Sequence, residues 1–257
     1  MAVTVTTGKT NVKYARALFG GANLSGDSRS LGNVGVSYAE DDVTGWEDIM
    51  NFLPGQGTLN FGPYQAVFNN NAAATGPVEP GVHTELAGIG SPIATAVIGI
   101  REAPTIGAPA FSAQLTQLSY VVTLAAGTPL VNADLTNAVG NSLSAYGWGQ
   151  ILANGTSTSS TTSFGSLDNG GSSANGAYAA LHVTTSAGAM GSNNWEIKIE
   201  DSADDSAWAD LIVFSADGSS ATAEWGSVAG TVDQYTRVTI TKSAGTDLIC
   251  WVNLIRL

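Results

Sequence analysis

The side chains that most often carry acid–base chemistry or bind metals are scarce and scattered in this sequence. There are two histidines, His83 in a Pro-Gly loop and His182 within an apolar stretch that alternates like a strand. A metal site needs His, Cys or carboxylate ligands at short spacings, and neither histidine has a second one near it. We therefore interpret His182 as an ordinary strand residue, and we predict no metal site, no cofactor and no catalytic residue.

The acidic residues form one cluster and no marked catalytic pair. Asp201, Asp204, Asp205 and Asp210 lie close together, but they do not match the calcium-binding spacing D-x-[DN]-x-[DN]-G. A solvated hairpin turn closed by Asx-type hydrogen bonds is the favoured interpretation. A glycoside hydrolase would need two carboxylates across a cleft, and the 21 acidic residues include no marked pair. No nucleophile-elbow motif occurs either, so we expect a protein that is not an enzyme.

Tryptophan is the remaining residue type with an obvious binding chemistry. The six tryptophans are Trp46, Trp148, Trp195, Trp208, Trp225 and Trp251. Exposed aromatic rings stack on sugar rings, so Trp148, Trp208 or Trp225 could form a carbohydrate platform. A tryptophan in or beside a strand is more often part of a core or a subunit interface. Both interpretations stay open on the sequence alone.

Composition restricts the class of protein. The chain has 257 residues, enough for one large or two smaller β domains, and a formal charge of −12 with only nine Lys and Arg. So few scattered cations argue against gripping nucleic acid, although acidic walls could face DNA that must slide. Only 12% of residues are charged, so solvated faces must be Ser, Thr, Asn and Gly, as in extracellular, viral or assembled β proteins.

The single cysteine and the apolar segments limit the compartment. Cys250 excludes an internal disulfide framework, and its place in an alternating strand predicts a buried apolar thiol. The N-terminus has no apolar core of a signal peptide, so we expect synthesis and retention in the cytosol until release. The apolar run Leu86 to Ile100 is too short and too broken by Gly and Pro to span a bilayer, and we interpret it as buried strand.

Alternating residues in the C-terminal third predict the strands that would position any site. The stretch WEIKIEDSADDSAWADLIVF, residues 195–214, reads as strand, acidic loop and strand, which is a hairpin. A hairpin alone is marginal in water, and Tyr178 to Thr184, Tyr235 to Thr241 and Leu248 to Leu254 supply further strands. These strands predict a compact antiparallel β unit.

The N-terminal half predicts further strands and one helix. Strands are expected at Val12 to Phe19, Leu59 to Phe68, Leu118 to Leu124 and Val131 to Leu135. Phe111 to Val122 also fits a helical spacing, but its β-branched residues favour strand. Thr44 and Glu47 form a capping box, with Asp41 and Asp42 favouring the helix N-terminus, so a short helix is expected near 45–53. Pro54 and Gly55 would end it.

A polar segment marks the best candidate boundary. Residues 154–173 are almost devoid of large apolar side chains. We therefore predict a β domain at 1–153, a polar loop or linker at 154–173 and a C-terminal antiparallel β unit at 174–257, with residues 1–12 as a polar arm. The predicted fold class is mainly β: an antiparallel β-sandwich with one short flanking helix and a second, C-terminal sandwich-like unit.

Two stretches resemble proteins of bacteriophage tails. NLSGDSRSLGNVGVSYAEDDVTGWEDIMNFLPGQGTLNFGPYQAVFNN, with Leu24-Ser25-Gly26, Asp42-Val43-Thr44-Gly45 and Leu53-Pro54-Gly55, is similar to the first half of the tail tube proteins of long-tailed phages. GAYAALHVT, WEIKIEDSADDSAWADLIVF and GTVDQYTRVTIT resemble a β unit of tail proteins from phages of Gram-positive bacteria.

The resemblance implies a structural virion protein. It implies synthesis in the host cytoplasm and assembly, as trimers or hexamers, into rings that stack into the tail tube. Its partners would be copies of itself and other tail proteins, with DNA as cargo that does not stick and no membrane. Candidate wall charges facing that DNA are Glu40, Asp41, Asp42, Glu196, Glu200 and Asp210. A capsid decoration protein and a carbohydrate- or receptor-binding tail module are the alternatives.

Overall fold

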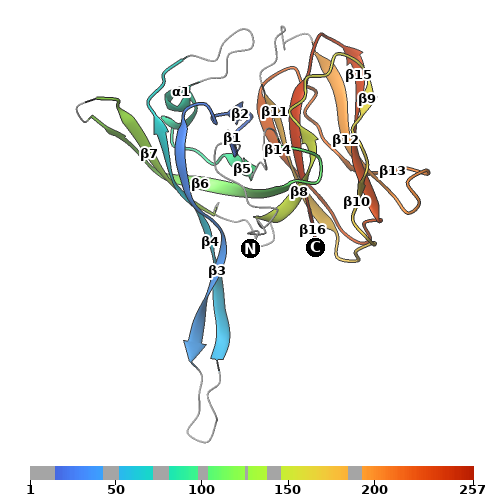
Figure 1. Ribbon diagram of the computed structural model, residues 1–257, viewed down its shortest axis with the longest axis horizontal. Helices are drawn as coiled ribbons and strands as arrows, with labels where there is room; N and C mark the ends of the chain where they lie inside the picture. Colours follow the sequence, from blue (N-terminus) through green and yellow to red (C-terminus); the bar gives the residue numbers. More distant parts are fainter. Residues whose placement is uncertain are drawn as a thin grey trace, which may run out of the picture.

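Alternating apolar and polar residues place antiparallel strands along most of this chain. The computed structural model describes residues 15–42, 52–71, 81–97, 104–124, 127–137, 146–184 and 193–257 (Figure 1). The first strands are β1 (Arg16–Phe19), β2 (Ala22–Asn23), β3 (Ser28–Asp42), β4 (Phe52–Val67), β5 (Ile93–Val97), β6 (Pro109–Thr123) and β7 (Leu130–Asn137), with helix α1 at Val82–Leu86. Within the described ranges, no helix is long and apolar enough to cross a membrane.

The later strands make up the C-terminal half, residues 146–257. They are β8 (Tyr146–Asn154), β9 (Thr162–Ser163), β10 (Leu167–Asp168), β11 (Ala177–Thr184), β12 (Asn194–Ser202), β13 (Ala209–Val213), β14 (Thr222–Val228), β15 (Tyr235–Ala244) and β16 (Ile249–Arg256). The predicted strands that fall in described ranges are confirmed, except in the run Leu86 to Ile100. There Leu86 ends helix α1 and Ile89 is 66% exposed, and Gly88, Gly90 and Pro92 interrupt the run, so only Ile93–Val97 of its described residues form a strand. The strand prediction for Phe111 to Val122 is also confirmed, since these residues lie in β6.

The predicted helix near 45–53 is not supported where it can be checked. Residues 43–51 lie outside the described residues, but Phe52 and Leu53 belong to strand β4, which continues through Pro54 and Gly55. This part of β4 pairs with β3 on one side only, so a proline there costs few ladder hydrogen bonds. Asp41 and Asp42 accordingly lie in β3 and do not precede a helix. The helix that the structure describes is α1, in a segment predicted as loop and strand.

Two sheets contain these strands. The larger has eleven strands in the order β14-β11-β16-β8-β6-β5-β1-β2, with β7, β4 and β3 attached through β6. Strand β6 serves both parts because its first half pairs with β5 and β8 while residues 115–123 pair with β7. The smaller sheet has the order β10-β15-β12-β13, with β9 also paired to β15. The mainly antiparallel β fold class is confirmed.

A first core fills the N-terminal half. It lies between the β3-β4-β7 part of the sheet and the β5-β1-β2 part, and Phe19, Phe61 and Phe111 are buried in it. Phe19 meets Phe61 edge-to-face with ring centroids 6.1 Å apart. Helix α1 closes one end, since Val82 and Leu86 are both buried in this core.

A second core forms the C-terminal sandwich. Trp195, Ile197 and Ile199 of β12 face the larger sheet, and Leu181 and Val183 of β11 face them in return. The alternation of apolar and polar residues in β12 therefore has the cause that the sequence predicted: one face of the strand is buried between two sheets and the other is turned outward.

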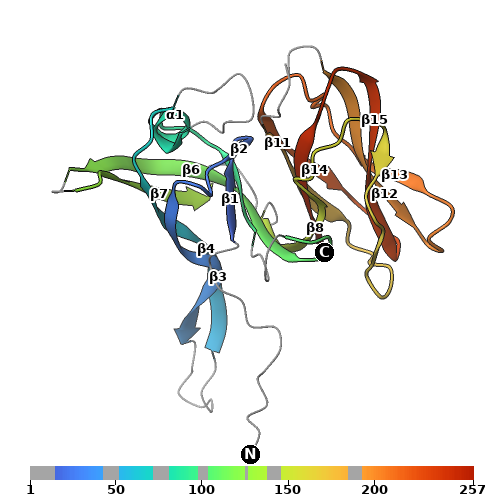
Figure 2. The ribbon, with the colours of Figure 1, turned by 45° about the horizontal axis from the view of Figure 1, so that its top comes forward.

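A third core lies on the face of the larger sheet that is opposite to the second core. Leu18, Val97, Ile151 and Trp251 pack together there, although they come from β1, β5, β8 and β16. The larger sheet thus curls until β1, β2 and β5 lie beside β11 and β14, as both ribbon views show (Figures 1 and 2). Strands such as β11 and β16 are buried on both faces for this reason, which removes the alternation expected of a half-exposed strand.

The predicted boundary region, residues 154–173, belongs to the C-terminal sandwich by its strand pairing. Within residues 154–173, β9 and β10 pair with β15, and Ser173 bridges to Val232. The first core draws on residues 17–135 and the second on residues 152–254. Strand β8, assigned by the sequence to the first domain, hydrogen-bonds to β16 as well as to β6. The division at 154–173 itself stays a prediction.

Two adjacent glycines test the closure of the curled sheet. Gly20 and Gly21 both have positive φ, +58° and +95°. A Cβ on Gly21 would lie 2.4 Å from the backbone nitrogen of Thr222 at the start of β14, whereas one on Gly20 would meet nothing within 4 Å. We expect Gly20→Ala to cost about 1–2 kcal/mol from backbone strain alone. Gly21→Ala should cost about 1–3 kcal/mol more because backbone cannot retreat like a side chain.

Denaturant unfolding of the two variants measures the difference. Equal losses for Gly20→Ala and Gly21→Ala would contradict the close approach of the β1–β2 turn to β14.

Candidate functional site

The most prominent surface feature is a two-stranded hairpin that leaves the body (Figure 1). β3 and β4 are 15 and 16 residues long, and β4 pairs with β7 only from Phe61 onward. Among the described strands, β3 pairs with β4 alone. We call residues 36–42 and 52–59 the arm. Trp46 lies in the 43–51 segment, outside the described residues.

Among the described strands, the arm is a ribbon of two strands with no third strand paired to it. A two-stranded ribbon is marginally stable in water, and an edge strand presents unpaired N–H and C=O groups to any strand that approaches. Val36 at the base of the arm is 36% exposed, and Trp148 of β8 is 47% exposed. Trp148 lies close to the arm, since a Cβ on Gly35 would be 3.9 Å from its Nε1. Backbone edge and apolar side chains therefore coincide at this base.

A second apolar surface lies at the far end of β6. Leu118, Val121 and Leu124 are 62%, 54% and 81% exposed. They belong to the β6–β7 hairpin, which projects on the side away from the C-terminal sandwich (Figure 2). Large apolar side chains gathered on one exposed hairpin are typical of an interaction surface.

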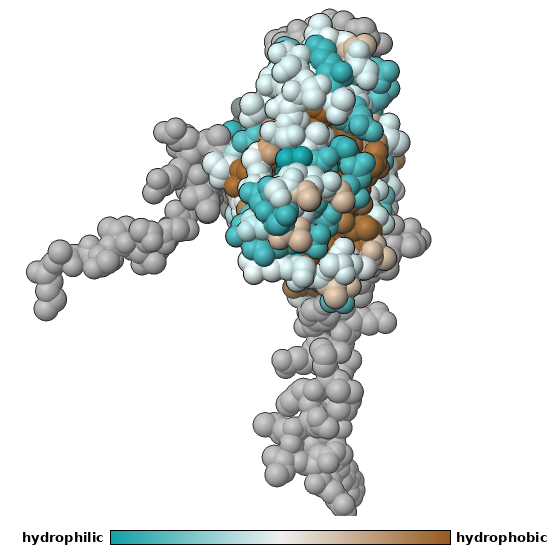
Figure 3. All heavy atoms as spheres, turned by 90° about the vertical axis from the view of Figure 1, so that its right-hand side faces the viewer, coloured by the Kyte–Doolittle hydropathy of each residue, from teal (hydrophilic) through white to brown (hydrophobic). Residues whose placement is uncertain are grey.

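The outer face of the five-stranded sheet carries a network of ion pairs. Glu200 is 7% exposed and accepts from Arg237 Nε at 2.8 Å and from the Thr239 hydroxyl at 2.8 Å. Lys198 Nζ lies 3.1 Å from the same carboxylate and 2.6 Å from Asp210. Figure 3 views the molecule from this side and shows hydrophilic residues at the middle of the face. Two cations and two anions make the cluster neutral overall.

The network fixes the charge of its members. Burial alone would raise the pKa of Glu200, but the hydrogen bonds from Thr239, Arg237 and Lys198 outweigh burial and lower it. The pKa of Lys198 is raised by its hydrogen bonds to Asp210 and then to Glu200. Glu200 is therefore an ionised, fully engaged carboxylate and not a free acid or base.

Trp208 is the tryptophan that this network touches. The guanidinium carbon of Arg237 lies 4.0 Å from the centroid of its ring, within the range of a cation–π contact. Trp208 is half-buried just before β13. It thus stands at the margin of the charged cluster with an aromatic surface that the second core does not use.

The other described tryptophans divide between core and surface. Trp195 and Trp251 are 2% and 8% exposed and belong to the second and third cores. Trp225 is half-buried and stacks on Tyr178 with centroids 6.0 Å apart. The expectation of core positions is confirmed for Trp195 and Trp251. Trp148 and Trp208 are the ones left with usable aromatic surface.

The acidic hairpin is a turn, as the sequence indicated. Asp204 Oδ1 accepts from the backbone N–H of Ala207 at 2.9 Å and of Ser206 at 3.0 Å, and from the Ser202 hydroxyl at 3.0 Å. These bonds, the one from Ala207 first, lower the pKa of Asp204. Asp205 adopts φ +59°, which Asp tolerates in turns. Within the described ranges, no group of three or more His, Cys, Asp or Glu is placed to hold a metal.

The two histidines have structural surroundings. His83 lies in α1 and not in a loop, and its Nδ1 is 2.8 Å from the Tyr120 hydroxyl. His182 is confirmed as a strand residue, in β11, and is 1% exposed. Cys250 is likewise buried as predicted, and burial raises the pKa of its thiol to about 12.

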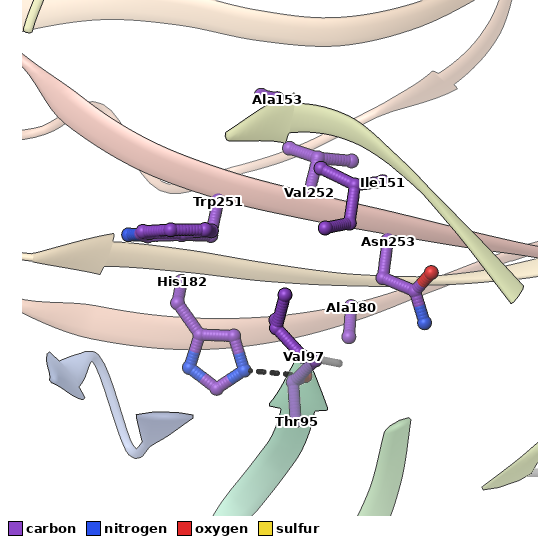
Figure 4. Close-up of a pocket in the computed structure, with 9 residues that line it drawn as sticks. All are labelled: Thr95, Val97, Ile151, Ala153, Ala180, His182, Trp251, Val252 and Asn253. Atoms are coloured by element: carbon purple, nitrogen blue, oxygen red, sulfur yellow. Dashed lines mark hydrogen bonds between the residues drawn. The ribbon is translucent and has the colours of Figure 1, made fainter. Parts of the chain in front are cut away.

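His182 belongs to a polar chain that crosses between the two halves (Figure 4). Its Nε2 is 2.9 Å from the Thr95 hydroxyl, which is 2.9 Å from the Ser112 hydroxyl. Asn253 Nδ2 donates to that Ser112 oxygen at 2.7 Å. His182 Nδ1 and Asn253 Oδ1 are buried with no partner among the described residues, at a cost of about 1–3 kcal/mol each. Burial lowers the pKa of His182 to about 3, so its ring is neutral.

The candidate wall charges have different environments. Glu196 is exposed on the outer face of β12. Glu200 is buried and neutralised, so it does not present a free negative charge, and Asp210 is paired with Lys198. Glu40, Asp41 and Asp42 lie in β3, but their side chains are outside the described part.

Comparisons with known proteins identify no family for this chain. No family model and no curated protein matches the chain. Among solved structures, the chain is similar to the Dit protein of phage SPP1, described as a paradigm of the hub adsorption apparatus in phages that infect Gram-positive bacteria. The TM-score is 0.25 at 7% identity, over 95% of this chain and 100% of that one. A TM-score this low establishes neither a shared fold nor a shared function.

The ion-pair network predicts a pH-dependent stability. We expect Glu200→Gln to lower the free energy of unfolding by about 1.5–3 kcal/mol at pH 7, because it weakens hydrogen bonds between charged partners. The pKa of Glu200 is depressed in the folded state, so its contribution is complete above the ordinary carboxyl value of 4.5. It is lost as the pH falls through the folded-state pKa.

Denaturant unfolding of wild type and variant across this range is the measurement. Asp210→Asn is the matched control because Asp210 is 51% exposed, and it should cost less than about 1 kcal/mol. A difference between wild type and Glu200→Gln that stays constant below pH 4.5 would contradict the assignment.

Proposed function

We propose that this chain is a structural protein of a bacteriophage virion that assembles with copies of itself through the arm, most specifically as a subunit of the tail tube. The observation that carries the proposal is the arm: a long two-stranded hairpin whose β3 edge has no partner among the described strands. The tail-tube resemblance of residues 23–70, which include the described parts of the arm, supports the same assignment.

Self-association follows from the hydrogen-bonding needs of the arm. An isolated ribbon of this length is stabilised when a third strand pairs with its edge, and another copy of the same chain can supply that strand. A head-to-tail contact of this kind closes into a ring when its rotation permits. Each weak contact is then repeated around the ring, so single interfaces need not be strong.

Charge supports the role of a passage for DNA. The chain carries a formal net charge of −12, and exposed carboxylates such as Glu196 repel the phosphate backbone. A lumen wall of this sign lets DNA pass without binding it. Other tail proteins are the expected partners at the ends of such a tube, and no enzymatic role is proposed, since Glu200, Asp204 and His182 are engaged in structural contacts.

Shortening the arm tests the proposal. Val36 and Leu59 face each other in the ladder, so replacing residues 37–58 by Asn-Gly joins them through a two-residue type I′ turn. We expect wild-type protein to form rings or tubes in negative-stain images and multi-angle light scattering. The shortened protein should be a monomer whose circular dichroism still has the shape of a folded β protein.

Two results would overturn the proposal. One is a wild-type protein that stays monomeric at every concentration; the other is a shortened protein that assembles as the full chain does. Electron microscopy of virions with a labelled antibody separates tail from head, because a capsid decoration protein would label the head.

A second candidate function is carbohydrate binding on the outer face of the five-stranded sheet. The favouring observation is Trp208, half-buried beside a neutral cluster of two cations and two anions. A neutral cluster with an aromatic ring suits an uncharged polyhydroxyl ligand, which can accept from Arg237 and donate to Asp210. We expect glycan-array binding that Trp208→Ala removes and Trp225→Ala retains. Absence of any glycan binding by the wild type would exclude this function.

A further inference from the structure

The two halves of the chain are joined in two physically different ways. Among the described residues, backbone hydrogen bonds between the parts before 138 and after 145 lie along one line, where residues 107–113 meet residues 146–151. Away from this β6–β8 ladder, the described residues join the halves through side chains and through the close approach of the Gly21 backbone to that of Thr222. We call these side chains the seam: Leu18, Thr95, Val97, Ser112, Ile151, His182, Trp251 and Asn253.

The ladder has the properties of a hinge axis. It is a single antiparallel pairing of β6 with β8, from Pro109 opposite Gln150 to Ala113 opposite Tyr146. Rotation about it would separate β1, β2 and β5 from β11 and β14 without breaking a described strand pairing, since neither group pairs with the other. The first and second cores would also stay intact, because each lies on one side of the axis.

The seam has the properties of a clasp. Its apolar part is small, and its polar part joins Thr95 and Ser112 of the N-terminal half to His182 and Asn253 of the C-terminal half. The imidazole is buried with Nδ1 unpartnered. Figure 4 shows the other ring nitrogen turned toward Thr95.

We propose that the C-terminal sandwich swings open about the β6–β8 ladder in acid, with protonation of His182 as the trigger. A protonated ring donates from both nitrogens. Nε2 would then donate to the Thr95 hydroxyl, and the Nδ1 proton would have no acceptor among the described residues. A buried charge without a partner is unstable, and opening the seam gives it water.

Among the described residues, no carboxylate faces the ring to stabilise the charged form. The neighbouring strands present Thr95 and Val97 from β5, Ala223 from β14, and Trp251 and Asn253 from β16. Of the titratable groups on these strands, Glu224 and Cys250 are in register with Leu181 and Val183, which lie in the second core on the other face. Arg16 shares its face of β1 with Leu18, and a cation there disfavours a second one.

The pH window follows from the direction of the shift. The closed form titrates at about 3, whereas an open form in water would titrate near the ordinary 6.5. The closed form is therefore fully stabilised above pH 6.5, and its stability relative to the open form decreases as the pH falls toward 3. Between pH 7 and pH 4.5 the ratio of open to closed molecules should rise roughly 50- to 100-fold.

Thiol labelling distinguishes opening of the seam from global unfolding. In Val97→Cys/Cys250→Ala the one thiol lies in the seam, whereas in wild type the one thiol, Cys250, lies in the second core. Rates with a dithiodipyridine, which reacts in acid, are divided by the rate of the same protein unfolded at the same pH. From pH 7 to pH 4.5 the position-97 rate should rise roughly 50- to 100-fold and should exceed the Cys250 rate at every pH, whereas global unfolding alone would label both thiols at the same normalised rate.

Variants at the clasp assign the trigger. His182→Gln keeps a polar partner for Thr95 but cannot be protonated, so the rise should vanish; His182→Asn serves if that variant does not fold. Thr95→Val should raise labelling already at pH 7 and keep the dependence on pH. Equal exposure of both thiols, no rise at position 97, or a rise that persists in the His182 variants would each overturn the proposal.

Discussion

The ladder formed by β6, β8 and β16 is the constraint on which the rest of this structure depends. Because β8 hydrogen-bonds to β6 on one side and β16 on the other, a single sheet passes from the N-terminal half into the C-terminal half. Each of the three cores packs against a face of that sheet, so the ladder fixes where the side chains of all three cores are placed. The curl of the sheet is what gives it three cores: adjacent residues such as Leu18 and Phe19 enter different ones.

This arrangement uses polar groups for structure and leaves association to the surface. The buried carboxylate of Glu200 is held by two cations, the Asp204 carboxylate closes a turn, and the His182 ring spans the seam. What the described fold leaves at the surface is an arm edge that no other described strand pairs with, and apolar side chains at the base of the arm and on the β6–β7 hairpin. Surfaces of this kind suit a protein whose work is to fit against other chains, and this reasoning links the fold to the proposed role in a virion.

Much of the strand content could be predicted, because alternation is a local signal. Trp195 to Glu200 alternate because one face of β12 is buried between two sheets. Prediction failed where a local signal competed with pairing at a distance: Thr44 and Glu47 suggested a helix, yet Phe52 and Leu53 continue a strand opposite β3. The third core could not be predicted either, because no local pattern around Thr95 or His182 indicates that these two residues, 87 apart in sequence, will be in contact. Glu200 was assigned to a charged wall because its cross-strand partner, Arg237, lies 37 residues away in sequence.

Scanning calorimetry at neutral pH tests the shared sheet most directly. Because both halves are built on one ladder, with the seam closed at that pH, the account predicts one unfolding transition whose calorimetric and van't Hoff enthalpies agree. Two resolved transitions, one for each half of the chain, would contradict it.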